Sequence, residues 1–447
     1  MTERLPGTEE QPFDVAVVGG GASGLAAALA AARGGASTCV IERDVEAGLT
    51  ILATGNGRCN LSNAHLDPSR YRHPEAFREV AGPEPEKELQ GFFESLGLMA
   101  IEEEDGRLYP RTGRAESVRD VLVQACGRED VNIRCGSSLD GARYDTVTDM
   151  WTLAMREPAE PLHYKRGHDN RTTLRNARKA LAATPLAERA ISARTVIIAC
   201  GGACKEVAGL FGLPHLTEKP ALCPIACDPC PTVPSYADAI GLKRLDGLRV
   251  KGALTLLRED VEVAHEEGEV LFRAYGLSGI AAFNLSRLCE PGDALRLDLF
   301  PELAEDDLAE VFRTREERIG PLDATGPSWF DGVLAPELGA QIHALACTGD
   351  ADPVSAAASL CKHLMFTITG LAESDRAQVR RGGIPLDVIE LSTLAVQPAL
   401  APALHVCGEA LDMDAGCGGY NLAWAWLSGL RAGTAAARIH NTKKEHA

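Results

Sequence analysis

A glycine-rich turn between a predicted strand and a predicted helix constrains this chain more than any other feature. Residues 14–18 form a short apolar run, and the turn that follows reads Gly19-Gly20-Gly21-Ala22-Ser23-Gly24. The Ala- and Leu-rich residues up to Arg33 favour a helix, and a second strand-like run ends at Glu42. In such a turn the first glycine permits the tight bend, the second lets the backbone approach a pyrophosphate, and the third lets helix pack on strand. The sequence therefore predicts a Rossmann-like start that binds a dinucleotide.

The residues around this turn also indicate which dinucleotide it suits. The helix N-terminus supplies free N–H groups and a positive dipole end for phosphates. The Glu42 carboxylate can accept hydrogen bonds from ribose hydroxyls, which favours an adenosine ribose without a 2′-phosphate.

The chain of 447 residues is too long for one ordinary core, so we expect two or three domains. An apolar run at 195–200, followed by Gly201-Gly202, predicts a buried parallel strand. The middle of the chain predicts antiparallel strands at 245–257, 261–265 and 269–272, with Glu267-Gly268 as a hairpin turn. Helices are expected at 301–319 and 353–365, and a last one from about 420 to 439. The predicted fold is α/β: a Rossmann-like domain formed by residues 1–210 and 367–447, with an inserted β-rich plus helical domain at 211–366.

Composition and charge favour a cytoplasmic protein as the default expectation. No apolar run has the length needed to span a bilayer, and the polar, acidic N-terminus does not resemble a signal peptide. Without an export signal, 14 cysteines predict reduced thiols. The formal net charge of −18 disfavours nucleic acid and membranes as partners. A small-molecule substrate is expected, and the sequence leaves the oligomeric state open.

Residues 54–60, TGNGRCN, form a second glycine-rich segment that can be neither a helix nor a central strand. One interpretation is a surface turn. The other is a loop whose backbone approaches a planar ring, with Arg58 and Cys59 offering a charge and a thiol.

Near the C-terminus, residues 406–412 (VCGEALD) and 416–421 (GCGGYN) precede the last predicted helix. This second strand–glycine–helix element fits a phosphate or ring-carbonyl contact at a helix N-terminus. An ordinary capped helix would have the same pattern.

Five segments together resemble a bacterial flavoprotein family. They are DVAVVGGGASGLAAALAAA, ILATGNGRCNLSN, GEVLFRAYGLSG, AQVRRGG and CGEALDMDAGCGGYNLAWAWLSGLRAG, in the order of the chain. The family is that of the NAD(P)/FAD-dependent oxidoreductases known as BaiN-like or as the aminoacetone oxidase family. The resemblance spans nearly the whole chain.

The resemblance implies FAD bound in extended form. The glycine turn would lie at the pyrophosphate, Glu42 at the adenosine ribose, 54–60 beside the isoalloxazine, and the C-terminal segment along the ribityl chain and pyrimidine edge. The candidate cofactor-binding residues are Gly19, Gly21, Ala22, Ser23, Gly24, Glu42, Arg43, Thr54, Gly55, Asn56, Gly57, Arg58, Asn60, Gly201, Gly408, Glu409, Asp412, Gly419, Tyr420 and Asn421.

The resemblance further implies flavin-mediated redox chemistry. We expect reduction of an activated C=C bond in an enone-like small molecule, with NAD(P)H as a transient electron donor. The alternatives are oxidation of a small amine and reduction of a uracil ring in RNA. The chain departs from the family pattern in its short 203–213 loop, in Arg273-Ala274, and in an apparent insertion at 157–194.

Reduction of a C=C bond requires a proton as well as a hydride. We hypothesise that Cys59, whose thiol could titrate near neutral pH, or Tyr275 in the inserted domain protonates the substrate. The alternative is that Cys59 only packs and that the proton comes from water. Arg58 would stabilise negative charge on flavin or substrate.

Three other patterns in the sequence suggest different kinds of site. Cys223, Cys227 and Cys230 have iron–sulfur spacing, but they straddle two prolines; we expect no cluster and no other metal site.

Residues 165–194 carry a net charge of +6 against −24 for the rest of the chain, with Arg171, Arg175, Arg178 and Lys179 at helical spacing. That stripe is either a solvated helix or a phosphate contact to RNA or a nucleotide. Trp424 and Trp426 are expected in the core.

Overall fold

The computed structural model describes residues 11–202, 204–229, 241–348 and 351–445. The chain forms two compact units, one made of Met1–Lys219 with Val379–Ala447 and the other of Pro220–Gln378. Both boundaries fall later in the chain than those predicted from the sequence, since the last strand of the second unit extends to Leu371. Within the described ranges, no helix has the length and apolar character to cross a membrane.

Five parallel strands form the centre of the first unit, in the order β20-β9-β1-β2-β6. They are β1 (Phe13–Val18), β2 (Thr38–Glu42), β6 (Asn132–Cys135), β9 (Leu186–Ile198) and β20 (Leu404–Val406). The apolar residues of β1 and the last part of β9 are buried, as continuous hydrophobic runs predict for strands covered on both faces. Because the strands are parallel, their carboxyl ends share one edge, where ligands of such sheets bind.

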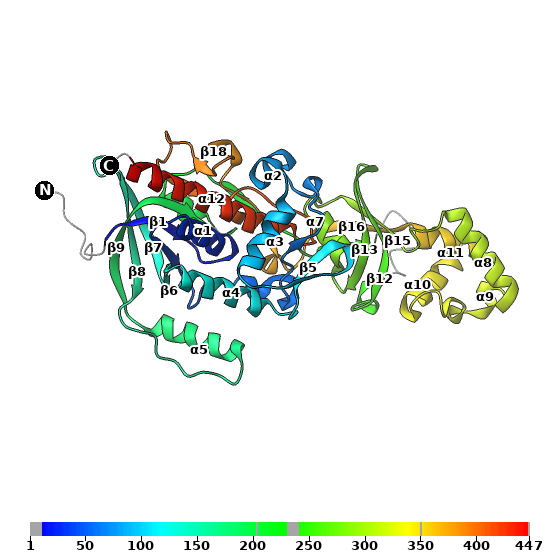
Figure 1. The fold of residues 1–447 in the computed structure, drawn as a ribbon. Coiled ribbons are helices and arrows are strands. Elements are labelled where there is room, and N and C mark those ends of the chain that lie inside the picture. Colours follow the sequence, from blue (N-terminus) through cyan, green and yellow to red (C-terminus); the bar gives the residue numbers. More distant parts are fainter. Residues whose placement is uncertain (1–10, 203, 230–240, 349–350, 446–447) are drawn as a thin grey trace. The chain divides into compact units, whose positions relative to one another are not determined.

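Strand β9 belongs to two layers of this unit. Its first part pairs antiparallel with β8 (Met150–Pro158), which pairs in turn with β7 (Ser138–Asp145). From Ala193 onward it pairs in parallel with β1. The connection between β8 and β9 carries helix α5 (Asn170–Ala183), which stands apart from the other helices of the unit in Figure 1.

Helix α1 (Ala22–Arg33) and the last helix, α12 (Tyr420–Glu445), pack closely although almost 400 residues separate them in sequence (Figure 1). A Cβ on Gly429 would lie 2.4 Å from the Ser23 carbonyl oxygen, and one on Gly433 would lie 2.1 Å from that of Ala27. Glycine is therefore required at both positions for the helix backbones to approach.

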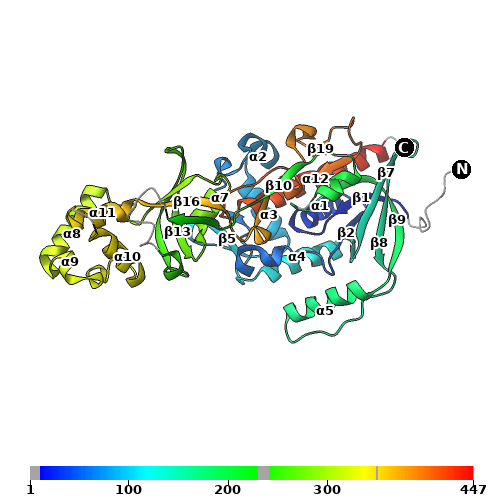
Figure 2. The same cartoon turned by 180° about the vertical axis from the view of Figure 1, so that it is seen from behind.

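The remaining elements of the first unit surround this core, as Figure 2 shows from behind. The helices are α2 (Pro74–Ala81), α3 (Pro85–Ser95), α4 (Ala115–Arg128) and α6 (Lys205–Leu210). A small sheet contains β3 (Ser62–Asn63), β5 (Arg107–Pro110) and β4 (Ala100–Glu102); β10 (Leu216–Ala221) pairs with β17 (Val379–Gly383), while β18 (Ile389–Glu390) and β19 (Ala395–Val396) extend the main sheet.

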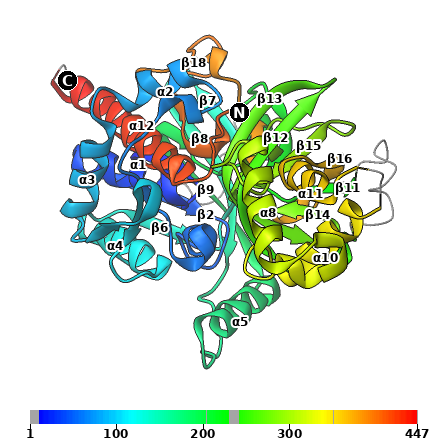
Figure 3. The same cartoon turned by 90° about the vertical axis from the view of Figure 1, so that its right-hand side faces the viewer.

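A closed barrel and a group of helices make up the second unit, seen in Figure 3. The barrel order is β11 (Ile225–Pro229), β14 (Gly276–Ser278), β13 (Val261–Arg273), β12 (Arg249–Arg258), β15 (Ala294–Asp298) and β16 (Leu364–Leu371). Its helices are α7 (Ile280–Ser286), α8 (Glu305–Ile319), α9 (Leu322–Thr325), α10 (Pro336–Ala346) and α11 (Pro353–Lys362). The predicted α/β fold with an inserted β-rich plus helical part is confirmed.

The predicted hairpin turn at Glu267-Gly268 is wrong. Gly268 lies inside β13 opposite Gly252, and the chain reverses at Glu259 and Asp260, whose φ angles are 50° and 62°. A Cβ on Gly252 would lie 2.5 Å from the Asp298 carbonyl oxygen. Glycine at position 252 thus accompanies close backbone packing within the barrel, whereas a Cβ on Gly268 would meet nothing within 4 Å. The sequence pattern alone does not separate such strand glycines from a turn.

Candidate functional site

The glycine turn lies between β1 and α1, at the carboxyl edge of the parallel sheet. Gly19 has a φ of 109°, and a Cβ there would be 2.4 Å from the Ala199 carbonyl oxygen. A Cβ on Gly24 would be only 1.9 Å from the Gly19 carbonyl oxygen. Both glycines are thus required by contacts within the protein.

Gly21 differs from these two because the protein does not fill the space beside it. Its backbone is in an ordinary extended conformation, and the only atom within 4 Å of a Cβ would be Thr50 Oγ1, at 3.2 Å. It is the N-cap of α1, whose first turn has no side-chain cap and no acidic residue. The Ala22–Ser23 end of this helix therefore offers N–H groups and a positive dipole to an anion, and a glycine leaves room for one.

Glu42, at the end of β2, holds the glycine turn in place through a backbone hydrogen bond. Its Oε2 accepts the Gly20 N–H at 2.7 Å, and its Oε1 accepts the Asp44 N–H at 2.7 Å. Each carboxylate oxygen has a further lone pair, so this anchoring is compatible with a ribose contact. Arg43, beside it, is exposed.

The C-terminal segment meets the glycine turn. Gly408 has a φ of 68°, and a Cβ there would be 2.4 Å from Ser23 Oγ, in the first turn of α1. The Gly408 N–H donates to Ser428 Oγ at 2.9 Å, and Trp424 Nε1–H donates to the Gly408 carbonyl at 2.9 Å. Trp424 and Trp426 are buried, which confirms their predicted place in the core. The N-terminal glycine turn and the C-terminal segment that contains Gly408 are therefore in direct contact at this edge.

Residues 54–60 comprise the end of an irregular 3-10 helix (Ile51–Gly57) and the turn that follows it, and they also join the site. Gly55 and Asn56 have left-handed backbones, and the Cys59 N–H donates to the Thr54 carbonyl at 3.1 Å. With its amide oriented to satisfy its neighbours, Asn60 accepts the Gly419 N–H at 3.0 Å. The segment thus lies against the loop that begins α12, as a loop that shapes a ligand site would, rather than as an isolated surface turn.

Cys59 does not have the chemistry predicted from the sequence. Its side chain is fully buried, and this burial raises the pKa of the thiol to about 12, against a smaller opposite effect of the Thr54 hydroxyl. The prediction of a thiol that titrates near neutral pH is wrong, because the sequence could not show how deeply the residue is packed.

The charge of Arg58 is already paired. Its guanidinium forms two hydrogen bonds with the Glu103 carboxylate, one of them 3.1 Å long, and lies 4.1 Å from the centre of the Tyr109 ring. Glu103 is 45 residues away in sequence, and no local pattern pointed to it.

Asp412 and Asn421 hold the C-terminal segment in shape. The buried Asp412 carboxylate accepts from Arg72 Nη1 at 2.6 Å and from the Gly382 N–H at 3.0 Å. The Asn421 amide bonds both the N–H and the carbonyl of Ala415, each at 2.9 Å. Tyr420 is buried beside Tyr71, and the Tyr71 hydroxyl donates to the Tyr420 carbonyl at 2.9 Å. Sequence reasoning missed Arg72, because its partner is 340 residues further on.

Glu409 is the strongly perturbed acid of this edge. Burial raises its pKa to about 7, although the Arg380 and Gly202 N–H groups and the charge of Arg380 act in the opposite direction. Gly201 and Gly202 follow β9, so Glu409 lies where the carboxyl ends of β9 and β20 meet. A carboxyl group with this pKa is protonated in a large fraction of molecules near neutral pH.

A cluster of Cys204, His215 and Glu218 lies in the same unit. Glu218 Oε1 accepts the Cys204 N–H at 2.9 Å and lies 3.0 Å from His215 Nε2, and the three potential ligand atoms are within 4.8 Å of one another. These hydrogen bonds satisfy the cluster without an ion.

Of the three cysteines with iron–sulfur spacing, Cys223 and Cys227 are buried in the second unit. Burial raises the pKa of the Cys227 thiol to about 12. Cys230 lies outside the described residues, so the absence of a cluster stays a prediction.

Tyr275 belongs to the second unit. Its hydroxyl donates to Glu373 Oε1 at 2.8 Å, and the Arg273 guanidinium lies 5.5 Å from its ring centre. Partial burial and the Glu373 carboxylate raise the pKa of the phenol to about 12. It remains protonated throughout the physiological pH range.

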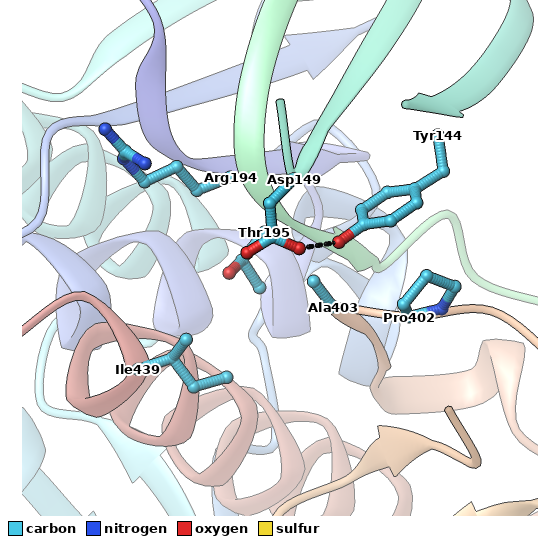
Figure 4. Close-up of a pocket in the computed structure, with 7 residues that line it drawn as sticks. All are labelled: Tyr144, Asp149, Arg194, Thr195, Pro402, Ala403 and Ile439. Carbon is cyan, nitrogen blue, oxygen red and sulfur yellow. Dashed lines mark hydrogen bonds between the residues drawn. The ribbon is translucent and has the colours of Figure 1, made fainter. Parts of the chain in front are cut away.

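A cavity of about 220 Å³ opens at the other edge of the parallel sheet (Figure 4). Arg194 and Thr195 line it just before the last part of β9, together with Tyr144, Asp149, Pro402, Ala403 and Ile439. It lies at the amino ends of the strands, away from the glycine turn, and contains none of the candidate residues.

Comparisons with known proteins agree with this architecture. Residues 13–150 match the model of the HI0933-like protein Rossmann domain, and residues 219–320 match that of the HI0933-like protein barrel and H2TH domain. The chain is 30% identical to the 3-dehydro-bile acid delta(4,6)-reductase of Clostridium scindens, over 95% of this chain and 98% of that protein. It is 25% identical to the ribosomal RNA dihydrouridine synthase of Escherichia coli, over 93% and 96%.

Among solved structures, the 3-ketosteroid-delta4-(5alpha)-dehydrogenase from Rhodococcus jostii RHA1 has a TM-score of 0.47 and 14% identity, over 97% of this chain and 99% of that one. The family assignment depends on the full-length sequence relative and the two matched domains instead. The chain belongs to the HI0933-like family of FAD-dependent oxidoreductases.

Proposed function

We propose that this enzyme reduces a carbon–carbon double bond conjugated to a carbonyl group in a small molecule, with NAD(P)H as the electron donor. The cofactor proposal is supported mainly by Gly21, which lies at an uncapped helix N-terminus and where a Cβ would meet no protein atom within 4 Å except Thr50 Oγ1, at 3.2 Å. The substrate class is supported by the names of the two relatives, a bile-acid reductase and a dihydrouridine synthase, since both describe reduction of such a bond.

The residues fit FAD in extended form. Gly19–Gly24 with Glu42 and Arg43 would hold the adenosine diphosphate half, since these positions surround the open helix end and the end of β2. The flavin half would be held by the 54–60 segment, Gly408–Asp412 and Gly419–Asn421. Asn60 joins the first of these to Gly419, while Asp412 and Asn421 fix the C-terminal backbone through Gly382 and Ala415. When bound, FAD would supply hydride transfer from its N5 atom.

The protein's own part in the reaction is to orient the substrate and to supply a proton. Burial raises the pKa of both Cys59 and Tyr275 to about 12, but Cys59 is fully buried whereas Tyr275 is partly exposed, so Tyr275 becomes the stronger candidate for the proton donor. The Arg58–Glu103 pair carries little net charge, so Arg58 would act mainly as a hydrogen-bond donor to a ring or carbonyl oxygen.

An anaerobic two-step experiment tests the proposal. The purified protein is first mixed with NADH or NADPH while flavin absorbance is recorded, and the bleached protein is then mixed with a panel of acceptors. Rapid reoxidation by conjugated enones, but not by amines or by uridine-containing RNA, is expected. Bleaching by an amine alone would instead identify an oxidase.

Reduction of a uracil ring in RNA is the second candidate, because the chain is also similar to a ribosomal RNA dihydrouridine synthase and carries basic residues on α5. Reoxidation by RNA at a rate that falls steeply with salt would favour it. The 30% identity with the small-molecule reductase over nearly the full chain makes the enone the first choice.

A further inference from the structure

The connection between β8 and β9, residues 159–185, is a folded arm. Its two ends meet, since the Ala159 N–H donates to the Pro185 carbonyl at 2.9 Å. Inside it, Asp169 caps α5 by accepting the Thr172 N–H at 2.6 Å, and Asn176 Nδ2 donates to the Lys165 carbonyl at 2.9 Å. Ala177, at the middle of α5, is fully buried. The arm is thus an ordered element, visible as the separate helix in Figures 1 and 3.

One side of the arm is fixed to the carboxyl edge of the parallel sheet. Arg178 forms a bidentate pair with Asp44, Nε to Oδ1 at 3.0 Å and Nη2 to Oδ2 at 2.6 Å. The Leu181 methyl group lies 3.0 Å from where a Cβ on Gly136 would be, directly after β6. The arm therefore contacts the segments that follow β2 and β6.

Asp44 connects this contact to the glycine turn. Its N–H donates to Glu42 Oε1, whose other oxygen accepts the Gly20 N–H, both at 2.7 Å. Its carbonyl accepts the Gly136 N–H at 2.7 Å. A continuous path of hydrogen bonds thus leads from Arg178 through Asp44 and Glu42 to the turn where the pyrophosphate would lie.

We propose that the arm retains the adenosine half of FAD, and that Arg178 is a positioning residue that fixes the Glu42–Asp44 segment beside the ribose. The inference rests on the cofactor site proposed above. The pair is half-exposed, with 56% of the Arg178 side chain and 28% of the Asp44 side chain accessible, so each single substitution should have a modest effect. Removal of the whole arm should have a larger one, since it also removes the contact with Gly136.

The test compares ligands that occupy different halves of the site. Binding of FAD, ADP and FMN to the flavin-free protein is measured by calorimetry for wild type, Arg178→Gln, Asp44→Asn and the double variant. Arg175→Gln is the matched control, because Arg175 is an exposed arginine of the same helix with no ion-pair partner among the residues that the structure describes. A fifth variant replaces residues 159–185 by Asn-Gly, which joins the paired residues Pro158 and Leu186 by a two-residue turn.

Arg178→Gln should lower the affinity for FAD and for ADP by the same factor, about three- to fivefold at low salt, and leave the affinity for FMN unchanged. The double variant should be no weaker than either single one. The arm deletion should weaken ADP by about tenfold or more, and the effect of Arg178→Gln should shrink at high salt.

Two results would contradict the role of the arm without contradicting the cofactor site. In the first, Arg178→Gln and Arg175→Gln bind ADP with the same affinity. In the second, Arg178→Gln loses as much affinity for FMN as for ADP, which would indicate a general loss of structure. A wild-type protein that binds neither FAD nor ADP would contradict the cofactor site, and the role of the arm with it.

Discussion

The glycine turn and the 54–60 segment contribute to the same site in opposite ways. In the turn, a Cβ on Gly21 would meet only Thr50 Oγ1, at 3.2 Å, and this is where we propose that the pyrophosphate of the cofactor lies. In the 54–60 segment, Cys59 is buried, Arg58 is paired with Glu103, and Asn60 is bonded to Gly419, so these identities are explained by the protein. Under the proposed function, the comparison separates residues that would meet the cofactor from residues that would hold the neighbouring loop in shape. Both kinds lie in glycine-rich motifs, and only the structure distinguishes them.

The largest effect should come from Gly21→Val. A branched side chain would fill the open space at the helix end, and FAD affinity should fall by at least a hundredfold, about 3 kcal/mol. The flavin content of purified protein, identified by chromatography after heat release, measures this. Since nothing but Thr50 Oγ1 is near, the melting temperature of the flavin-free variant should stay within a few degrees of wild type.

Gly24→Ala is the matched control, because its Cβ would meet backbone 1.9 Å away. It should destabilise the flavin-free protein as well. If Gly21→Val also unfolds the flavin-free protein, the distinction between the two glycines is lost.

This contrast also explains how far the sequence could be interpreted. The turn, β1, β2 and α1 were predictable because their signals lie within about thirty residues, and the buried strand ending β9 was predictable from its unbroken apolar run. The sequence did not predict the first part of β9 or the continuity of β13. It also did not predict which residues pair with Asp412 and Arg58. Arg72 and Glu103 are far from the residues they bind, and their charges look like any exposed arginine or glutamate until the chain is folded.

The next effect in size should come from Tyr275→Phe. Removal of the hydroxyl should slow reoxidation of the bleached flavin by an enone by about a hundredfold, the lower end of the 10²–10⁴ that a general acid usually contributes. Bleaching by NAD(P)H should be unchanged. Because the pKa of Tyr275 is raised to about 12, the wild-type rate should show no loss of this acid between pH 6 and 10. Stopped-flow absorbance separates the two half-reactions, and an unchanged reoxidation rate would remove Tyr275 from the mechanism.

A pH-dependent effect is expected at Glu409. Its pKa is raised from 4.5 to about 7 in the folded protein, so folding favours the protonated form. The stability gained is fully present below about pH 4.5 and is lost as pH rises through about 7. Urea unfolding of the flavin-free protein should therefore show wild type losing about 1–3 kcal/mol between pH 5 and 8 relative to Glu409→Gln. Parallel curves for the two proteins would show that the carboxyl group is not perturbed.

The smallest effect on activity should come from Cys59→Ala, and it tests the comparison most directly. If Cys59 only fills the cavity wall, its replacement removes one buried sulfur atom and should cost about 1–2 kcal/mol of unfolding free energy. FAD content, bleaching by NAD(P)H and reoxidation by an enone should all stay within about twofold of wild type, because the fully buried thiol stays protonated at neutral pH and has no solvent access through which to exchange its proton. Cys361→Ala, a fully buried thiol of the second unit, is the control for a purely structural loss. A slow reoxidation step in Cys59→Ala, with the control unaffected, would return this thiol to the reaction and would show that burial in the flavin-free fold does not decide which residues of the 54–60 segment meet the substrate.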